Sequence, residues 1–139
     1  MKNVYDILLE NLELYEEKNE DSFICEFEKN IGIVFPTEYR KIISMSNGAN
    51  GDLGNEYIEL WSLEDIEDFE MEIGTDSLNG LLPFASNGCG MAYAFKKNSE
   101  EIWVVPMDSV NFKSSKKCSE NFDELIIRLY EGEIIQYGV

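Results

Sequence analysis

The side chains of this chain that could do chemistry are carboxylates and three cysteines, and the chain contains no histidine. Cys89 stands in a glycine-rich segment, but it has no imidazole base that could activate it as a nucleophile. The cysteines lack a CxxC spacing, so a zinc site is not expected either. We expect Cys89 to be a small buried residue. The sequence predicts no catalytic residue, no metal site and no cofactor.

Two further segments resemble binding motifs only in part. Asn47-Gly48 and Asn50-Gly51 could shape an anion-binding loop, but they lack the spacing and the lysine of a P-loop, so we interpret both as turns. The segment 52–59 contains acids and a glycine without the spacing of an EF-hand. Pairs of carboxylates can be found anywhere in so acidic a chain, and their presence therefore does not indicate acid–base catalysis.

The charge of the chain is strongly negative, with 28 acidic and 11 basic residues and a net charge of −17. This balance argues against binding of nucleic acid or anionic membranes, because both need clustered lysine and arginine. It favours a basic partner or simply high solubility. There is no apolar run of the roughly 20 residues that a membrane helix needs, and the N-terminus lacks the features of a signal peptide. We expect a cytoplasmic protein with reduced cysteines.

The acids are distributed unevenly. Ten lie between residues 52 and 76, where there is no lysine or arginine, whereas residues 96–117 carry five lysines and three acids. Several acids of a helix predicted from Ser62 lie off its apolar stripe and face water, and like charges four residues apart, such as Glu64 and Asp68, cost a few tenths of a kcal/mol. Two interpretations remain open: a solvated face that favours solubility, or a docking surface for a basic protein, such as the nucleic-acid groove of a nuclease.

The candidate partner-binding residues come from this acidic segment. Aromatic residues are enriched at interface hot spots, but a tryptophan at the end of a short strand is more often partly buried core. We favour the core interpretation for Trp61 and Tyr57, and equally for Trp103 and Tyr93. The candidates are Glu59, Trp61, Glu64, Asp65, Glu67, Asp68, Glu72 and Asp76.

The elements that must position these residues are organised around the segment 82–95. It is predicted to form a hairpin with a two-residue turn at Asn87-Gly88, followed by a half-buried strand. Further strands are predicted at 57–61 and 102–106, with a polar loop over 108–117. The end of the chain, 134–139, is either a strand or a tail.

Helical periodicity predicts five helices. They cover 2–17, 23–31 and the segment from Pro36, as its first residue, to Asn47; the fourth begins at Ser62 and the fifth, capped by Ser119, ends at Gly132. Helices in a block, then strands, then a closing helix indicate a single α+β domain over 1–139 with a mainly antiparallel sheet. The residues predicted to face the core include Tyr15, Phe23, Phe27, Tyr39, Ile42, Ile43, Leu63, Ile66, Phe69, Ile73, Phe122, Leu125, Ile126, Leu129 and Tyr130.

Several segments, in this order, resemble the SUKH superfamily, which includes the Smi/Knr regulators of fungi and many bacterial toxin-immunity proteins. The resemblance covers roughly residues 20–131. It departs from the family at Met91 and Lys96, where acids are common. The resembling segments are Phe27-Glu28, Ile31-Gly32, Phe35-Pro36-Thr37-Glu38-Tyr39-Arg40, Asn47-Gly48, the run from Ile58 to Ile66, Leu82-Pro83-Phe84-Ala85 with Gly88 and Gly90, and Phe122-Asp123-Glu124-Leu125.

The resemblance implies an α+β fold that binds a protein partner and has no catalytic activity. A compact domain without long flanking regions resembles the immunity branch, whose partners are polymorphic toxins, often nucleases. We therefore expect a non-enzymatic immunity protein that occludes a basic cognate toxin and is a monomer or a weak homodimer. The alternative is a regulatory scaffold that binds an endogenous cellular protein. A toxin gene beside this one would favour immunity.

Overall fold

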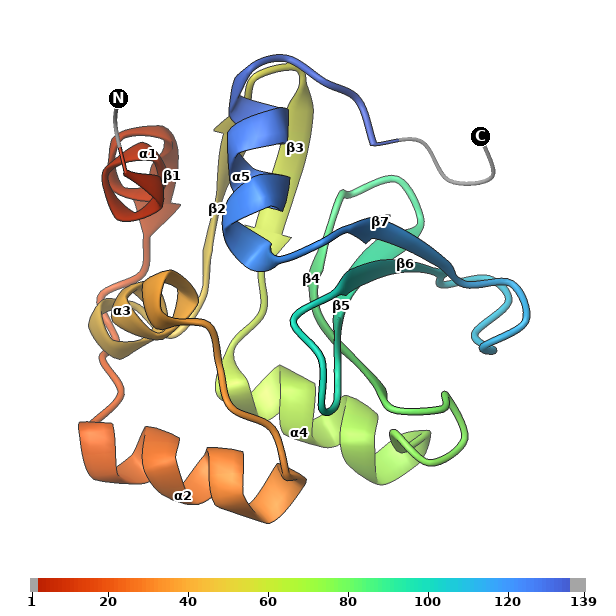
Figure 1. Ribbon diagram of the computed structural model, residues 1–139. Coiled ribbons are helices and arrows are strands. Elements are labelled where there is room, and N and C mark those ends of the chain that lie inside the picture. Colours follow the sequence, from red (N-terminus) through yellow and green to blue (C-terminus); the bar gives the residue numbers. More distant parts are fainter. Residues whose placement is uncertain (1–2, 136–139) are drawn as a thin grey trace.

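The computed structural model describes residues 3–135 and has the predicted α+β architecture (Figure 1). Over these residues the chain forms five helices and one seven-stranded sheet. The helices are α1 (Val4–Asn11), α2 (Asp21–Ile31), α3 (Thr37–Met45), α4 (Leu63–Glu72) and α5 (Phe122–Tyr130). The strands are β1 (Leu12–Leu14), β2 (Ala49–Leu53), β3 (Glu56–Leu60), β4 (Leu81–Ser86), β5 (Met91–Lys96), β6 (Ile102–Pro106) and β7 (Lys116–Ser119).

The sheet is antiparallel throughout, and its strands lie side by side in the order in which the chain makes them. Helix α5 lies over one face of the sheet and contacts both β2 and the edge strand β7, so the last helix joins two strands that are far apart in the sheet (Figure 1). Helix α4 contacts β4, and α1 packs against α3 and α5. The sheet and the helices packed on it bury a continuous apolar core between them.

The main core is centred on Tyr39 of α3, which is fully buried, as are Ile42 and Ile43 on the same helix face. This part of the helix prediction is confirmed. The Tyr39 ring meets Phe84 and Phe95 edge-on, with centroid distances of 5.4 and 5.0 Å. Burial raises the pKa of its hydroxyl, which has no hydrogen-bond partner among the described residues.

A smaller apolar cluster covers the other face of β5. Ala94 and Val105 are buried there against Leu78 and Leu81, with Trp103 and Phe112 packed on them. Strand β5 is therefore buried on both faces from Met91 to Phe95, and the prediction of a half-buried strand was wrong. Sequence alternation did not reveal this, because the second layer comes from the segments that follow α4 and β6.

The hairpin between β4 and β5 has a four-residue loop in place of the predicted two-residue turn. The Asn87 side chain accepts hydrogen bonds from the backbone N–H groups of Cys89 and Met91, and Gly88 and Gly90 take the positive φ angles. This loop places Cys89 at the surface, so the expectation that Cys89 is buried was also wrong.

The N-terminal helix ends at Asn11, earlier than predicted, and the chain continues as the edge strand β1. Leu12 pairs with Gly51 of β2, where a Cβ would lie 2.5 Å from the carbonyl oxygen of Asn11. Asn50-Gly51 is thus part of a strand, and its prediction as a turn was wrong. Gly51 permits this close approach because it has no side chain. Tyr15 consequently lies outside the helix and is 36% exposed.

Four other side chains predicted to belong to the core are exposed, and these predictions were wrong: Phe23, Tyr57, Ile73 and Tyr130. Helix α2 begins at Asp21 without a side-chain cap, and its buried positions are Ile24 and Phe27. A shift of one residue in the helical phase is enough to move Phe23 outward. Pro36 is the N-cap residue of α3 and not its first residue. The strand predicted over 57–61 lies one residue earlier, with Ile58 and Leu60 buried as expected.

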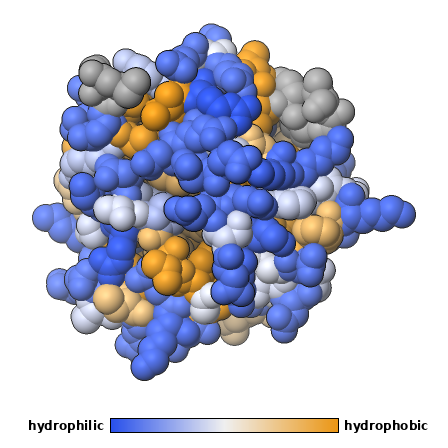
Figure 2. All heavy atoms as spheres, viewed as in Figure 1, coloured by the Kyte–Doolittle hydropathy of each residue, from blue (hydrophilic) through white to orange (hydrophobic). Residues whose placement is uncertain are grey.

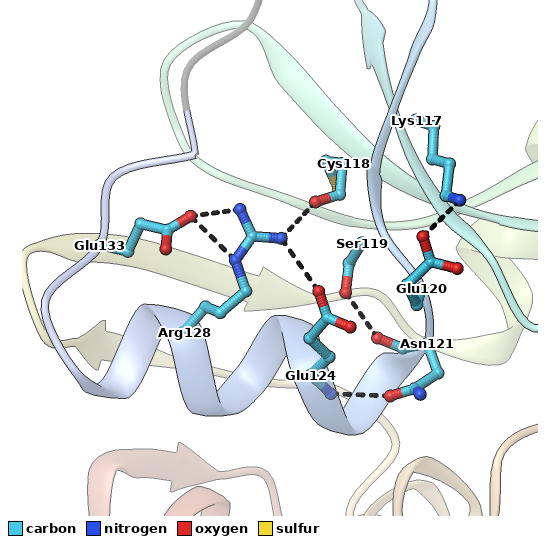
Figure 3. A network of polar contacts seen from close by, with 8 residues as sticks. All are labelled: Lys117, Cys118, Ser119, Glu120, Asn121, Glu124, Arg128 and Glu133. Atoms are coloured by element: carbon cyan, nitrogen blue, oxygen red, sulfur yellow. Dashed lines mark hydrogen bonds and ion pairs between the residues drawn. The ribbon is translucent and has the colours of Figure 1, made fainter.

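The connection between β7 and α5 also differs from the prediction (Figure 3). Part of the segment predicted as a loop is β7, and the helix cap is Asn121, whose side chain accepts from the Glu124 N–H, not Ser119. Arg128 donates to the Cys118 carbonyl and pairs with Glu133, so it ties α5 to β7 and to the chain beyond the helix. Ile134 and Ile135 are not in a strand; the remainder of the segment 134–139 lies outside the described residues.

Candidate partner-binding groove

The acidic segment forms one side of a groove where β3 passes into α4. The Ser62 hydroxyl accepts a hydrogen bond from the Asp65 N–H at 3.1 Å, which starts α4 at the predicted residue. Because Leu63 and Ile66 face the core, one remaining side of the helix faces the end of β3. The groove has a volume of about 360 Å³ and is lined by Tyr15, Glu59, Leu60, Trp61, Ser62, Asp65, Asp68, Phe69 and Glu72.

Aromatic rings form the apolar part of this groove. The rings of Trp61 and Phe69 are in contact, with centroids 6.1 Å apart, and both side chains are half-buried. The Tyr15 hydroxyl accepts a hydrogen bond from Asn50 at 2.7 Å. Its ring lies over Gly48, where a Cβ would come within 2.8 Å of the ring and φ is +111°. A side chain at position 48 would therefore displace Tyr15 from the groove.

Four carboxylates surround these rings: Glu59, Asp65, Asp68 and Glu72. Within residues 3–135 none of the four side chains makes a hydrogen bond or an ion pair. The groove thus combines partly exposed aromatic surface with unneutralised negative charge. Such an arrangement can bind a cationic group, because a cation is attracted both by carboxylates and by the face of an aromatic ring.

The structure brings together five of the eight predicted partner-binding residues: Glu59, Trp61, Asp65, Asp68 and Glu72. Glu64 instead accepts a hydrogen bond from Asn47 at 2.6 Å, Glu67 is exposed elsewhere on α4, and Asp76 lies in the turn after it. The partner-binding role of all eight stays a prediction. Trp61 packs against the main core while it lines the groove, so the core interpretation and the surface interpretation both describe it.

The residue that positions the groove is Asn47, which sequence reasoning had explained only as a turn residue. Its side-chain oxygen accepts from the Leu63 N–H at 2.9 Å and from Asn19 at 3.0 Å, and its amide donates to Glu17 and Glu64. Asn47 is buried, so these bonds are protected from water. They join the segment that carries Tyr15 to the first turn of α4. The Asn47-Gly48 pair is visible in the sequence, but a turn motif does not indicate which distant groups its asparagine side chain will bind.

A second, larger hollow of about 680 Å³, here called the cleft, lies between the α2–α3 connection, the β5–β6 turn and the start of α5. Its apolar floor is made of Phe35, Phe95 and Phe122, which are all buried core residues. Val34 on its wall is 85% exposed. The face of the molecule in Figure 2 is largely hydrophilic, with several separate apolar patches. Sequence reasoning missed the cleft because its walls come from three distant segments.

The cleft also contains three carboxylates: Glu38, Glu100 and Asp123. Burial raises the pKa of Asp123, and the charges of Glu38 and Glu100 raise it further. Glu38 has a structural contact, since its carboxylate accepts a hydrogen bond from the Tyr5 N–H at 3.2 Å and pairs with Lys41.

Metal binding, thiol chemistry and membrane insertion have little support in the described residues. Residues 3–135 contain no cluster of three or more side chains suited to hold a metal ion. Burial raises the pKa of the Cys118 thiol to about 12, so it is protonated at neutral pH. Over the same part of the chain, every helix is too short or too polar to cross a membrane.

Comparison with known proteins identifies the family of this chain. The model of the SMI1/KNR4 family (SUKH-1) matches residues 19–128, and the chain therefore belongs to this family. The family is generally one of non-enzymatic immunity and regulatory domains. The matched region contains all of the groove except Tyr15, and it contains the whole cleft. A search among curated proteins found no match.

Proposed function

We propose that this protein is a non-enzymatic, cytoplasmic immunity protein that binds a basic cognate toxin and occludes its active or substrate-binding face. Its membership of the SMI1/KNR4 family supports this function. The observation that carries the proposal is the groove beside α4, where four carboxylates without partners among the described residues surround partly exposed aromatic rings.

The charge of the groove matches the surface of an enzyme that acts on nucleic acid. A nuclease binds phosphates through clustered lysine and arginine, and that cluster is complementary to the acidic side of α4. Complementary charge speeds association and disfavours wrong partners, while aromatic anchors at the centre of an interface supply much of the affinity. Occupation of the basic cluster by the groove would keep the substrate out, and no catalytic group is needed for this.

The test is co-expression with the toxin encoded beside the gene, with cell survival as the measurement. Asp65, Asp68 and Glu72 are changed together to lysine, and protection is expected to be lost. Glu67→Lys is the control for position, because it reverses one charge on the same helix outside the groove, and protection is expected to be kept. Full protection by the triple variant, with native circular dichroism, would contradict the proposed groove. A gene neighbourhood without a toxin would instead support the regulatory scaffold.

A further inference from the structure

We propose that the groove binds an arginine side chain of the partner, with the guanidinium stacked on the exposed face of Trp61 and paired with the carboxylates of α4. The inference rests on the proposed function only in assigning this arginine to the toxin. The geometry itself specifies a site for one cationic side chain, and this site can be tested without the toxin.

The first argument comes from the other tryptophan of the chain. Trp103 lies against Phe112 with centroids 5.2 Å apart, and the ammonium of Lys96 stands 5.5 Å from the centroid of each ring. Trp61 and Phe69 form a second tryptophan–phenylalanine pair with similar spacing. Among the described residues no lysine or arginine lies over this second pair. One pair has an internal cation, and the other presents its rings to solvent among carboxylates.

The indole N–H groups differ in the same way. The N–H of Trp103 donates to Glu101 at 3.0 Å, whereas the N–H of Trp61 has no hydrogen-bond partner within residues 3–135. It is not shielded from solvent either, since only the hydroxyls of Tyr39 and Tyr93 are both fully buried and unpartnered in that range. The indole of Trp61 therefore provides both a free ring face and an accessible polar group, which is a sensitive spectroscopic reporter.

The second argument concerns the carboxylates. Asp68 and Glu72 lie in the second half of α4, and the last turn of this helix has no basic residue. Acids near a helix C-terminus are unfavourable because the helix dipole is negative there. Helix stability thus does not explain these two acids. Their positions along the groove, with Asp65 one turn earlier, are explained by a cation that lies beside them.

The shape of the site favours arginine over lysine. Trp61 and Phe69 touch each other, so a cation cannot enter between the rings and must lie on an exposed face. A planar guanidinium stacks on such a face and still directs its N–H groups to carboxylates at its edge. A lysine ammonium is a compact, strongly hydrated charge and makes poorer use of a flat aromatic surface.

The experiment is an NMR titration of the full chain with single-residue probes: acetyl-Gly-Arg-Gly-amide, the lysine analogue and the uncharged citrulline analogue. The two tryptophan indole signals are assigned with Trp61→Phe. We expect the arginine peptide to shift the Trp61 signal in a saturable way, at least about fivefold more tightly than the lysine peptide, and to leave Trp103 unmoved. The citrulline peptide is expected to cause no saturable shift.

Variants separate the groove from general acidity. Asp68→Asn with Glu72→Gln is expected to weaken the binding of the arginine peptide at least about fivefold. Glu67→Gln is expected to change the affinity for this peptide less than about twofold. Equal binding of citrulline, binding of lysine as tight as that of arginine, or an equal effect of Glu67→Gln would each overturn the proposal. A failed titration beside intact toxin protection would refute the arginine site alone. Binding without protection would refute the proposed function alone.

Discussion

The groove and the cleft are built from the same kinds of residue, yet they differ in what holds those residues. In the cleft the aromatic floor is buried core, Glu38 is bonded to the backbone of α1, and Asp123 lies in the first turn of α5, where the helix dipole favours an acid. In the groove the rings are half-exposed, and Asp68 and Glu72 lie where the dipole disfavours them.

This difference separates a hollow whose aromatic floor belongs to the buried core from one that leaves aromatic surface exposed beside its acids. The larger volume belongs to the cleft, but its aromatic floor is buried core and Glu38 on its wall is already bonded to α1. The groove is smaller and leaves charge and aromatic surface unmatched. Unmatched surface chemistry is therefore a better guide to the partner than size.

The largest expected effect is on the affinity for the toxin, which we expect to depend on the charges of the groove and not on those of the cleft. Asp68→Lys with Glu72→Lys is expected to weaken binding about 100-fold, or about 2.7 kcal/mol, because two attractive contacts become repulsive. The same change in charge at the cleft, Glu100→Lys with Asp123→Lys, is expected to alter affinity less than about threefold. Calorimetric titration measures both. A larger loss of affinity in the cleft variant than in the groove variant would place the toxin at the cleft.

The support beneath the groove is tested with Asn47→Ala. This change leaves the Leu63 N–H and Asn19 without their buried acceptor, and we expect it to lower the free energy of unfolding by about 2–3 kcal/mol. Urea denaturation measures the loss. Asn50→Ala removes a single exposed hydrogen bond to Tyr15 and is the matched control, with an expected cost below about 1 kcal/mol. Equal costs would show that Asn47 is only a turn residue.

The core beneath the cleft is tested with Tyr39→Phe. The Tyr39 hydroxyl is buried without a partner among the described residues, so its removal is expected to raise the free energy of unfolding by about 1 kcal/mol. Tyr15→Phe is the control, since that hydroxyl accepts a hydrogen bond and its loss is expected to be slightly destabilising. A clear loss of stability in Tyr39→Phe would reveal a hydrogen bond to this hydroxyl.

The smallest expected effect is a pH dependence of the free energy of unfolding that comes from Asp123 in the cleft. The pKa of Asp123 is raised in the folded state, so the folded protein holds this proton more tightly than the unfolded chain does. The contribution of Asp123 to stability therefore falls as pH rises through the folded pKa. Relative to wild type, Asp123→Asn is expected to gain stability between about pH 4 and pH 7.

Asp21→Asn is the control with the opposite sign. Its hydrogen bond to Arg40 lowers the pKa of Asp21, so its contribution is present at neutral pH and is lost as pH falls through the folded pKa. Relative to wild type, this variant is expected to lose stability as pH rises to about 4, and the difference is expected to stay constant from there to neutral pH. Thermal unfolding at several pH values measures the stability of each variant relative to wild type. If this difference changed with pH in the same direction for both variants, the opposite pKa shifts of Asp123 and Asp21 would be contradicted.

Much of the fold could be predicted because it depends on local periodicity. The core faces of α3 and α5, the Ser62 cap of α4 and the strand 102–106 follow from residues a few positions apart. The ordered segments of the family were also visible without a structure. The acidic character of the segment 52–76 is likewise a property of composition, and no fold is needed to see it.

The tertiary structure decided which acids could act together. The sequence placed Glu64, Glu67 and Asp68 in one acidic run, but Asn47 engages the first, the second faces elsewhere, and only the third meets Trp61 across the groove. Strand β1 and Tyr15 likewise depended on a pairing with Gly51 and on contact with Gly48, more than 30 residues away. Helical spacing defines the side of a helix on which a residue lies, and only the packing of distant segments defines what that side faces.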